Sequence, residues 1–510
     1  MSVEPAVEPK GASKSEETSD PWLAALGEEI DSQFGTTDDE AKTRAAIADA
    51  VGVLAQKAAE GTIPSDIVRY INGVIAELDA QLTEQVNEII HHPEYQELEA
   101  TWRGLDFLVR RTPARDNLKI RVMPVSKKEL GKELDKYAGA RWQQSAFFKR
   151  VYGDGIDKFN GEPYGCVIGA YYFDHTAPDV ALLQEIAKTA ASAHAPFIAS
   201  AGPKLLGFDR WDKLNDPESI KAIMATPERA RWRALRDQED ARYLGLTMPR
   251  FLARDPYGEN NPVEEFNFVE TTTSTVETKA GSQVQRPDAS KFCWANAAFA
   301  MGANVNRAFA KYNWCVKIRD VDGGRVEDLP VHTFPTDDGS TDATCPTEIA
   351  IGKIRATEIE QLGLIPLCHF QNTNYAVFNS ANSVQQPKNY DEPDAKANAE
   401  LASRLQYMFA VSRFSHYLDA MAVHWRGKFT SRDELQRDLV KWVKQYVLES
   451  PQLHSEIDKA RKPLAHAAVE VSDVEGKPGY FQATFRLKPH FQFEGIKASV
   501  RLVSKEFGGK

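Results

Sequence analysis

The residues best placed for catalysis are Asp174 and His175, which directly follow a nearly continuous apolar run at 165–173. Such a run is typical of a strand that is buried on both faces. Open α/β sheets bind ligands beyond the carboxyl ends of their strands, so an acid and an imidazole there could form an acid–base pair. Cys166 lies near the start of the same strand, roughly 30 Å from His175 by strand rise, and cannot pair with it as nucleophile and base. We favour a polar strand end without a catalytic role, because catalysis requires a demonstrated geometry.

Two further groups of residues suggest a metal site without meeting its requirements. His91 and His92 are adjacent, and adjacent residues do not share a helix face, so we expect them at the start of a helix. Asp337, Asp338 and Asp342 lie in a DDGSTD stretch that faintly resembles a calcium loop. Because this stretch lacks the terminal Glu and the full spacing, it predicts a solvated turn. We predict no metal ion.

The remaining motifs add no catalytic site. Four arginines mixed with acidic residues predict an exposed, ion-paired helix rather than a phosphate site, namely Arg229, Arg231, Arg233 and Arg236. The chain contains no G-x-x-x-x-G-K-[ST] or G-x-G-x-x-G loop, no H-E-x-x-H and no G-x-S-x-G. We therefore predict no cofactor and no enzymatic activity. An α/β enzyme centred on Asp174 and His175 remains as an alternative, and it rests on fold position alone.

The composition is typical of a globular protein in a reducing compartment. The 510 residues carry a net charge of −11, which argues against a general nucleic-acid binder. No apolar run approaches the roughly 20 residues needed to cross a bilayer, and residues 1–19 lack the apolar core of a secretory signal. The five cysteines form no C-x-x-C pair, so they suggest buried thiols rather than disulfides or a zinc site. These features fit the cytoplasm, without insertion into a membrane.

The stretch 91–111 predicts a helix with one apolar stripe. Its large apolar residues recur at spacings of three and four, at Tyr95, Leu98, Trp102, Leu105 and Val109. An ordinary helix whose stripe faces the core explains this pattern. Gly104 costs roughly 1 kcal/mol relative to Ala in a helix interior, which suggests that another backbone passes close to it.

The middle of the chain predicts a mixed α/β fold. A strand at 165–173, an Ala-rich helix at 181–194 and a strand at 196–201 form a plausible right-handed βαβ unit. Further helices are expected at 217–243 and 292–312, and further strands at 314–319, 348–354, 366–370 and 375–379. A segment rich in Asn, Gln, Pro and Asp, 381–394, is typical of a linker, and helices follow at 396–425 and 431–449.

The end of the chain alternates apolar and polar residues, as a strand with one buried face does. The apolar positions are Phe481, Ala483, Phe485, Leu487, Phe491, Phe493, Val500 and Leu502, with Ile496 and Ala498 between them. An isolated hairpin is marginally stable at best, so these strands need a sheet to join. They could complete a sheet of their own chain or pair with another chain.

The start of the chain predicts an amphipathic helix on a polar arm. Residues 1–19 are expected to be disordered, and residues 20–35 place Trp22, Leu23, Leu26 and Ile30 on one helix face. A short helix of this kind, flanked by polar sequence, is marginal alone and suits docking to a partner. Packing on its own domain is an equally good explanation.

Several long segments of the sequence resemble one protein family, the large sheath subunit of the bacterial type VI secretion system (TssC/VipB). The segments occur in the same order as in the family, and the resemblance spans roughly residues 65–500. They are HHPEYQELEATWRGLDFLVRR at 91–111, GCVIGAYYFDH at 165–175, APFIASAGPKLLGF at 195–208, LGLTMPRFLARDPYG at 244–258, FCWANAAFAMG at 292–302, PLCHFQNTNYAVF at 366–378 and FRLKPHF at 485–491.

The resemblance implies a fold and a domain order. It implies an α/β (mixed α+β) sheath core at 65–380 that follows a helical linker at 36–64. After the linker at 381–394, a C-terminal domain at 395–510 would carry helices and strands that interlace with neighbouring subunits in an intersubunit sheet.

The resemblance also implies a structural function. The expected partners are the small sheath subunit (TssB/VipA), other sheath copies, the Hcp inner tube, the baseplate and a ClpV-type ATPase that would bind the helix at 20–35. Such a subunit works in the bacterial cytoplasm, within a tail anchored at the envelope. A sheath subunit of a related contractile injection particle remains as an alternative, although the docking helix argues mildly against it.

Overall fold

The computed structural model describes residues 67–508 except 159–160, 216–218, 260, 265, 278–282, 336–340, 426–430, 451–452, 476–479, 491–499 and 504–506. The docking helix predicted at 20–35 and the linker predicted at 36–64 lie outside these residues. The chain divides into two compact units, residues 1–85 and 86–510, and the second contains the elements described below.

A six-stranded mixed sheet forms the centre of the second unit, in the order β1-β2-β3-β11-β12-β8. Its strands are β1 (Val167–Phe173), β2 (Phe197–Ala201), β3 (Leu244–Met248), β11 (Ile365–His369), β12 (Ala376–Phe378) and β8 (Arg325–Val326). β1, β2 and β3 pair in parallel, and β3 pairs in parallel with β11. The predicted βαβ unit is thereby confirmed, with α7 (Ala177–Ala193) as its crossover helix.

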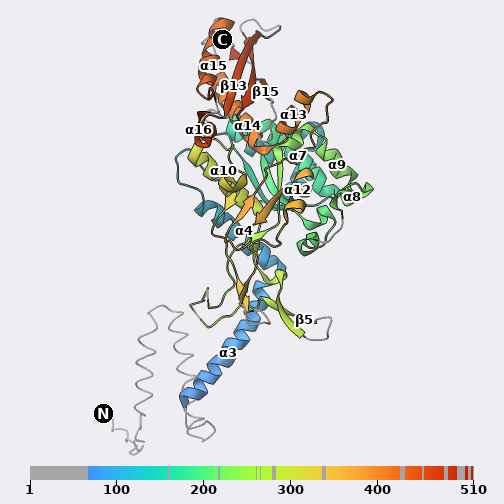
Figure 1. Cartoon of the computed structure of the whole chain (residues 1–510), viewed down its shortest axis with the longest axis vertical. Coiled ribbons are helices and arrows are strands. Elements are labelled where there is room, and N and C mark those ends of the chain that lie inside the picture. Colours follow the sequence, from blue (N-terminus) through green and yellow to red (C-terminus); the bar gives the residue numbers. More distant parts are fainter. Residues whose placement is uncertain are drawn as a thin grey trace, which may run out of the picture. The chain divides into compact units, whose positions relative to one another are not determined.

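Helices cover both faces of this sheet (Figure 1). Successive residues of a strand point to opposite faces, so Phe197 and Ala199 of β2 pack with α7 while Ile198 packs with α10 (Ala297–Tyr312). A side chain on Gly302 of α10 would lie 2.2 Å from the Ile168 side chain, so the missing side chain lets the helix lie close to β1. The sequence predicts this two-sided burial because these strands are apolar throughout.

The remaining helices and strands around this sheet are short. The helices include α5 (Lys127–Lys136), α6 (Ala146–Phe148), α8 (Ile220–Met224), α9 (Ala230–Arg236), α11 (Asp320–Gly323), α12 (Lys353–Gln361) and α13 (Pro393–Ala402). Three two-stranded sheets pair β4 (Phe251–Leu252) with β7 (Trp294–Ala295), β5 (Thr273–Glu277) with β6 (Gln283–Pro287), and β9 (Thr333–Pro335) with β10 (Thr341–Ala343).

Several predicted elements differ from the structure, and the helix predicted at 292–312 begins only at Ala297, after β7. Neither of the segments 314–319 and 348–354 contains a strand. Each has irregular backbone that runs into the next helix, α11 or α12. The helix predicted at 217–243 is divided into short helices that include α8 and α9. The helix predicted at 396–425 is interrupted at Ser403 and Arg404, between α13 and α14 (Leu405–His424). Residues 381–386 form backbone hydrogen bonds to the α/β region, including Val384 N–H to Leu244 O at 2.9 Å.

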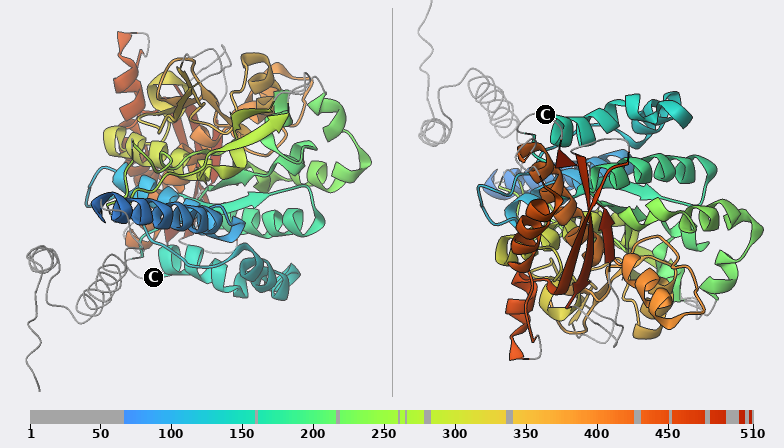
Figure 2. Two further views of the ribbon diagram at one scale, coloured as in Figure 1. Left: turned by 90° about the horizontal axis from the view of Figure 1, so that it is seen from below. Right: turned by 90° about the horizontal axis from the view of Figure 1, so that it is seen from above.

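A second sheet carries the end of the chain. It pairs β13 (Leu464–Asp473), β14 (Tyr480–Pro489), β15 (Val500–Val503) and β16 (Phe507–Gly508), with β14 between β13 on one side and β15 and β16 on the other. Helices α14, α15 (Arg432–Lys444) and α16 (Glu456–Arg461) complete this region. Figure 2, on the right, looks onto the dark red strands and the orange-red helix beside them. One hydrophobic cluster includes residues of both this sheet and α10, so the two sheets share a core.

The helix predicted at 91–111 is present as α4 (Pro93–Arg110), but the expectation that its stripe faces the core is wrong. Its buried residues are Gly104 and Leu108, which lie against Phe299 of α10. A side chain on Gly104 would lie 2.3 Å from the Phe299 ring, so the predicted close approach involves a side chain rather than a backbone. Tyr95, Leu98, Trp102 and Val109 of the stripe are exposed, and Leu105 is half-buried against the same cluster as Leu108.

Candidate functional site

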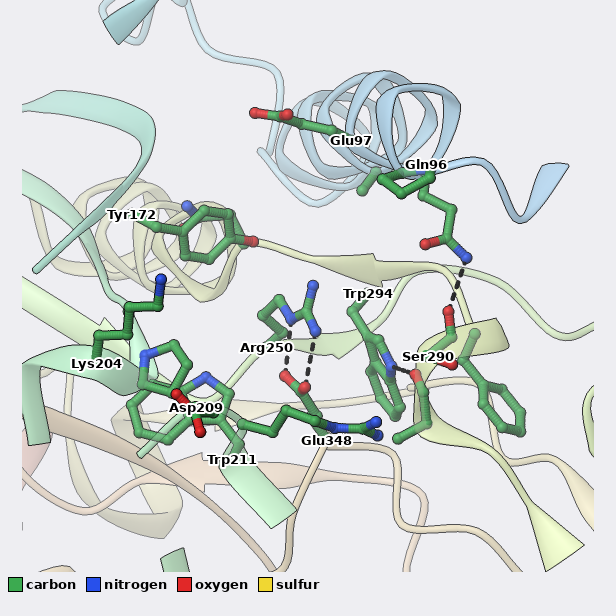
Figure 3. Close-up of a pocket in the computed structure, with 18 of the residues that line it drawn as sticks. Gln96, Glu97, Tyr172, Lys204, Asp209, Trp211, Arg250, Ser290, Trp294 and Glu348 are labelled. Carbon is green, nitrogen blue, oxygen red and sulfur yellow. Dashed lines mark hydrogen bonds and ion pairs between the residues drawn. The ribbon is translucent and has the colours of Figure 1, made fainter. Parts of the chain in front are cut away.

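A cavity of about 560 Å³ opens at the carboxyl ends of β1, β2 and β3 (Figure 3). Tyr172 and Asp174 come from the end of β1, Lys204 from the segment after β2, and Arg250 from the segment after β3. Glu97 and its neighbours on α4 line the cavity as well. This is the place where an α/β enzyme would bind its substrate, so the predicted catalytic pair can be tested here.

A bidentate ion pair in the cavity joins Arg250 to Glu348. Both guanidinium–carboxylate distances are 2.7 Å, and Figure 3 shows the two parallel bonds. Burial would lower the pKa of Arg250, but its bonds to Glu348 outweigh this effect and raise the pKa. A carboxylate engaged on both oxygens by a fixed cation is poorly suited to remove a proton. The pair instead links the loop after β3 to the segment before α12.

Asp174 and His175 do not form an acid–base pair. Burial, followed by the nearby Asp179 carboxylate, raises the pKa of Asp174. Its Oδ1 atom is buried and finds no hydrogen-bond partner among the described residues. The His175 ring instead lies with Nδ1 3.1 Å from the backbone oxygen of Lys204. In the part of the chain that the structure describes, no hydrogen bond joins the Asp174 carboxylate to this ring.

The cysteine and histidine candidates do not assemble a reactive or metal-binding site. Cys166 packs against the larger hydrophobic core, and burial raises the pKa of its thiol. His91 has Nε2 3.5 Å from Glu270, whereas His92 is exposed at the start of α4, as predicted. Among the described residues, no group of three or more His, Cys, Asp and Glu could hold a metal ion. Asp337 and Asp338 lie outside the described residues.

Of the four arginines at 229–236 that are predicted to be exposed and ion-paired, Arg231 is exposed, but the other three are not. Arg229 and Arg236 are buried, and each donates hydrogen bonds to backbone oxygens, including Leu205 O and Val384 O at 3.0 Å. Arg233 likewise donates to two backbone oxygens. These side chains join loops to one another, and a pattern of charge along the sequence could not reveal backbone acceptors far away in the chain.

The C-terminal sheet provides a different kind of site, which consists of backbone. The predicted alternation of β14 is confirmed, because Phe481, Ala483, Phe485 and Leu487 are all buried. They pack under α14 and α15 of the same chain; the Phe485 and Trp442 rings, for example, meet edge to face. Val500 and Leu502 lie in β15, whose backbone pairs with Leu487 and Phe485. Phe491 and Phe493 lie outside the described residues, as do Trp22, Leu23, Leu26 and Ile30.

β13 gives this sheet an open edge that the sequence did not reveal. The N–H of Val474 bonds to Tyr480 O, just beyond the ladder, and the register from His466 to Asp473 continues from this pair without a shift. Hydrogen-bonded pairs alternate in an antiparallel ladder, so Ala467, Val469, Val471 and Asp473 point their N–H and C=O groups away from β14. Along these residues, the described part of the chain supplies no backbone partner.

In the described residues, Asp174 and His175 thus form no acid–base pair, and the edge of β13 that faces away from β14 is open. Residues 72–385 match the family described as "EvpB/VC_A0108, tail sheath N-terminal domain", and residues 394–506 match its "tail sheath gpW/gp25-like domain". The chain belongs to the TssC/VipB family of type VI secretion sheath large subunits.

A curated relative supports the same assignment. The chain is 50% identical over 468 residues to "Type VI secretion system sheath protein TssC1" of Pseudomonas aeruginosa, a match that covers 91% of this chain and 92% of that protein. The family is one of structural proteins, so the chain is not an enzyme. The searched residues include no helix that is long and apolar enough to span a membrane.

Proposed function

We propose that this subunit polymerises with the small sheath subunit (TssB/VipA) and with further copies of itself around the Hcp inner tube. Contraction of the resulting sheath from the baseplate propels the tube. The observation that carries this proposal is the open edge of β13 in a sheet whose apolar face is already covered by its own chain. A strand from a neighbouring subunit can extend such a sheet without disturbing the core.

The number of bonds at this edge suits a mechanical link. Ala467, Val469, Val471 and Asp473 each offer one N–H and one C=O to an added strand. Each backbone hydrogen bond contributes about 0.5–1.5 kcal/mol net, so a strand held by roughly six of them is held by several kcal/mol. Repeated along a polymer, these links would keep neighbours attached while the α/β regions change their relative positions.

The remaining parts of the proposal follow from the family. The sheath assembles in the bacterial cytoplasm in an extended state, and a kinetic barrier delays its conversion to a shorter state with better interfaces. The domain boundaries at 65–380, 381–394 and 395–510 belong to this proposal. So does recognition of Trp22, Leu23, Leu26 and Ile30 by a ClpV-type ATPase that recycles contracted sheaths.

Co-expression with the small subunit tests the proposal. We expect the two chains to co-purify as hollow tubules by electron microscopy, and we expect this chain to aggregate when it is expressed alone, because its strand edge lacks cover. A large subunit that stays soluble and monomeric and does not bind the small subunit would refute the proposal.

Removing residues 1–35 should leave the tubules intact and abolish only their disassembly by the ATPase. Loss of the tubules would show instead that the N-terminal arm has an architectural role.

A further inference from the structure

The β1 edge of the central sheet has no neighbouring strand among the described residues. β1 is the first strand in the order of this sheet and is apolar throughout, yet most of its residues are only half-buried. Every residue of β2 and β3 is buried. Natural sheets rarely leave an apolar strand uncovered at an edge, because such an edge pairs readily with other chains. β1 therefore has the composition of an inner strand at the position of an outer one.

The register of β1 shows which of its backbone groups point outward. The N–H of Val167 bonds to Pro196 O, on the side of β2. Because successive residues of a strand direct their backbone groups to opposite sides, Ile168 directs its N–H and C=O away from β2. Neither group of Ile168 has a partner in the part of the chain that the structure describes. The outer edge of β1 is thus open to a further strand.

A second segment with open backbone groups runs beside this edge. Residues 119–125 belong to no helix or strand, although Ile120 and Val122 alternate with polar and basic neighbours as apolar residues do in a strand. Their N–H groups bond to nothing in the described chain, and of their C=O groups only that of Val125 does, to the Tyr171 hydroxyl at 2.7 Å. Backbone polar groups need partners, so this row is a second place for a strand to pair.

Side chains, and not backbone bonds, join residues 119–125 to β1. Arg121 bonds to Glu162, ahead of β1, at 2.8 Å, and the Tyr171 contact follows further along both segments. Lys127 continues the series, with Nζ 2.6 Å from Tyr172 O. The order of these contacts shows that the two backbones run in the same direction. Each contact spans a long side chain, whereas the backbones of paired strands lie only about 4.8 Å apart.

A strand between the two backbones would supply partners to both. A helix bonds its own N–H and C=O groups, so only an extended chain can pair with two open rows. The faces of β1 indicate its side chains. Ile168 and Ala170 pack toward α4 and α10, whereas Val167 and Tyr171 pack in the cluster that contains α7. A strand added beside β1 meets the same two layers, so it should be apolar on both faces.

The sequence argues that this strand comes from another polypeptide. Every strand of the described residues already lies in a sheet of this chain. The apolar runs within residues 1–66, at 22–26 and 50–55, lie in stretches rich in Ala, which favours helix. Pairing β1 with β1 of a second copy would form a two-fold contact that closes on itself instead of extending a polymer. A second kind of chain meets the requirement without these conflicts.

We propose that the small sheath subunit contributes a strand, apolar on both faces, that pairs between β1 and residues 119–125. The central sheet would then be completed by two polypeptides. The proposal rests on the proposed function, because that function supplies the second chain. It differs from strand addition at β13, since here the added strand enters the α/β core instead of extending the C-terminal sheet.

Photo-crosslinking in assembled tubules tests this proposal. The substitution Val122→p-benzoylphenylalanine is made in the chain co-expressed with the small sheath subunit, because the Val122 side chain is 63% exposed. Ile354→p-benzoylphenylalanine, at an exposed apolar position on α12, is the control. We expect position 122 to crosslink an apolar segment of the small subunit at least tenfold above position 354. Crosslinks to another copy of this chain, to residues 1–66, or to nothing above the control would overturn the proposal.

A proline substitution tests the backbone pairing itself. The Val125 C=O points toward β1, so Met123, two residues earlier, directs its N–H to the same side. Met123→Pro removes this N–H and no bond within the described chain, and it should reduce the small subunit recovered with the chain at least tenfold. Met123→Thr keeps the N–H and should give wild-type recovery. Wild-type recovery from Met123→Pro, or equal loss from both variants, would overturn the pairing.

The outcomes separate this proposal from the proposed function. If the two wild-type chains form no complex at all, the proposed function fails and the inserted strand fails with it. Tubules that form normally while position 122 crosslinks elsewhere overturn the inserted strand alone. The crosslinking result does not depend on whether Met123→Pro folds, because Val122 is exposed and makes no hydrogen bond within the described residues.

Discussion

The cavity at the strand ends and the C-terminal sheet differ in where their hydrogen-bonding groups find partners. In the cavity, Arg250 and Glu348 bind each other, and next to Asp174 the His175 ring lies against a backbone oxygen of the same chain. In the C-terminal sheet, β13 leaves the outward groups of Ala467 to Asp473 without partners in the described chain. The cavity leaves the single Oδ1 atom of Asp174 without a partner, whereas the β13 edge leaves a continuous row of backbone groups open. For a structural protein, function is better sought at unsatisfied edges than among reactive residues.

The largest effect is expected where the two sheets share their core. Phe485→Asp should destabilise the subunit by more than about 5 kcal/mol, because it removes a buried ring and buries a charge. The chain should then be insoluble even with the small subunit. Gln482→Asp, on the exposed face of the same strand, is the control and should remain soluble. A soluble Phe485→Asp chain with a normal melting temperature would show that β14 is not packed on its own helices.

A buried ion network around α4 should give the next largest effect. Glu270→Ala should cost about 3–5 kcal/mol at pH 7, because it leaves Arg254 without one of its two carboxylates. Burial would raise the pKa of Glu270, but His91 and Arg254 outweigh burial and lower it. The stabilisation is therefore present above the ordinary pKa, about 4.5, and is lost as the pH falls below it.

Thermal melting between pH 7 and pH 3 checks this prediction. The wild type should lose stability as the pH falls, and the Glu270→Ala variant should lose less of it. Glu162→Ala removes an exposed acid whose ion pairs with Lys119 and Arg121 lie at the surface, so its melting curve should differ from that of the wild type far less than that of Glu270→Ala. Parallel pH curves for wild type and Glu270→Ala would contradict the role assigned to the network.

The open edge should respond to a change that the fold tolerates. Ala467→Pro replaces an outward N–H with ring carbons, which blocks an incoming strand without removing a bond to β14. We expect a stability change below about 1 kcal/mol and no tubules by electron microscopy. Ala467→Ser keeps the N–H and should form tubules normally. Tubules at the wild-type level from Ala467→Pro would show that the edge takes no strand.

The cavity should give the smallest effect. Asp174→Asn with His175→Ala should assemble and contract as the wild type does, since neither side chain has a catalytic partner. Burial raises the pKa of Asp174, so its charge is slightly unfavourable at pH 7. Removing it should stabilise the fold by less than about 1 kcal/mol after solvent screening, and the gain should vanish near pH 3. Loss of contraction with intact assembly would revive a chemical role.

The α/β centre could be predicted from the sequence because its strands are apolar throughout and its crossover helix is rich in alanine. β13 could not, because alanine at 465, 467 and 468 gives little contrast between its two faces. The helix α4 and its apolar face could be predicted from the spacing of the large apolar residues. Spacing shows only that a face is apolar, and not which chain covers it. The burial of Arg229 and Arg236 could not be predicted, because their backbone acceptors are distant in sequence.

The account depends on β13 accepting a strand from another chain. A density map of the co-purified tubules at a resolution that separates strands tests this most directly. We predict a fifth strand, contributed by a neighbouring subunit, bonded along Ala467 to Asp473. A β13 edge that faces solvent in the assembled sheath would contradict the account.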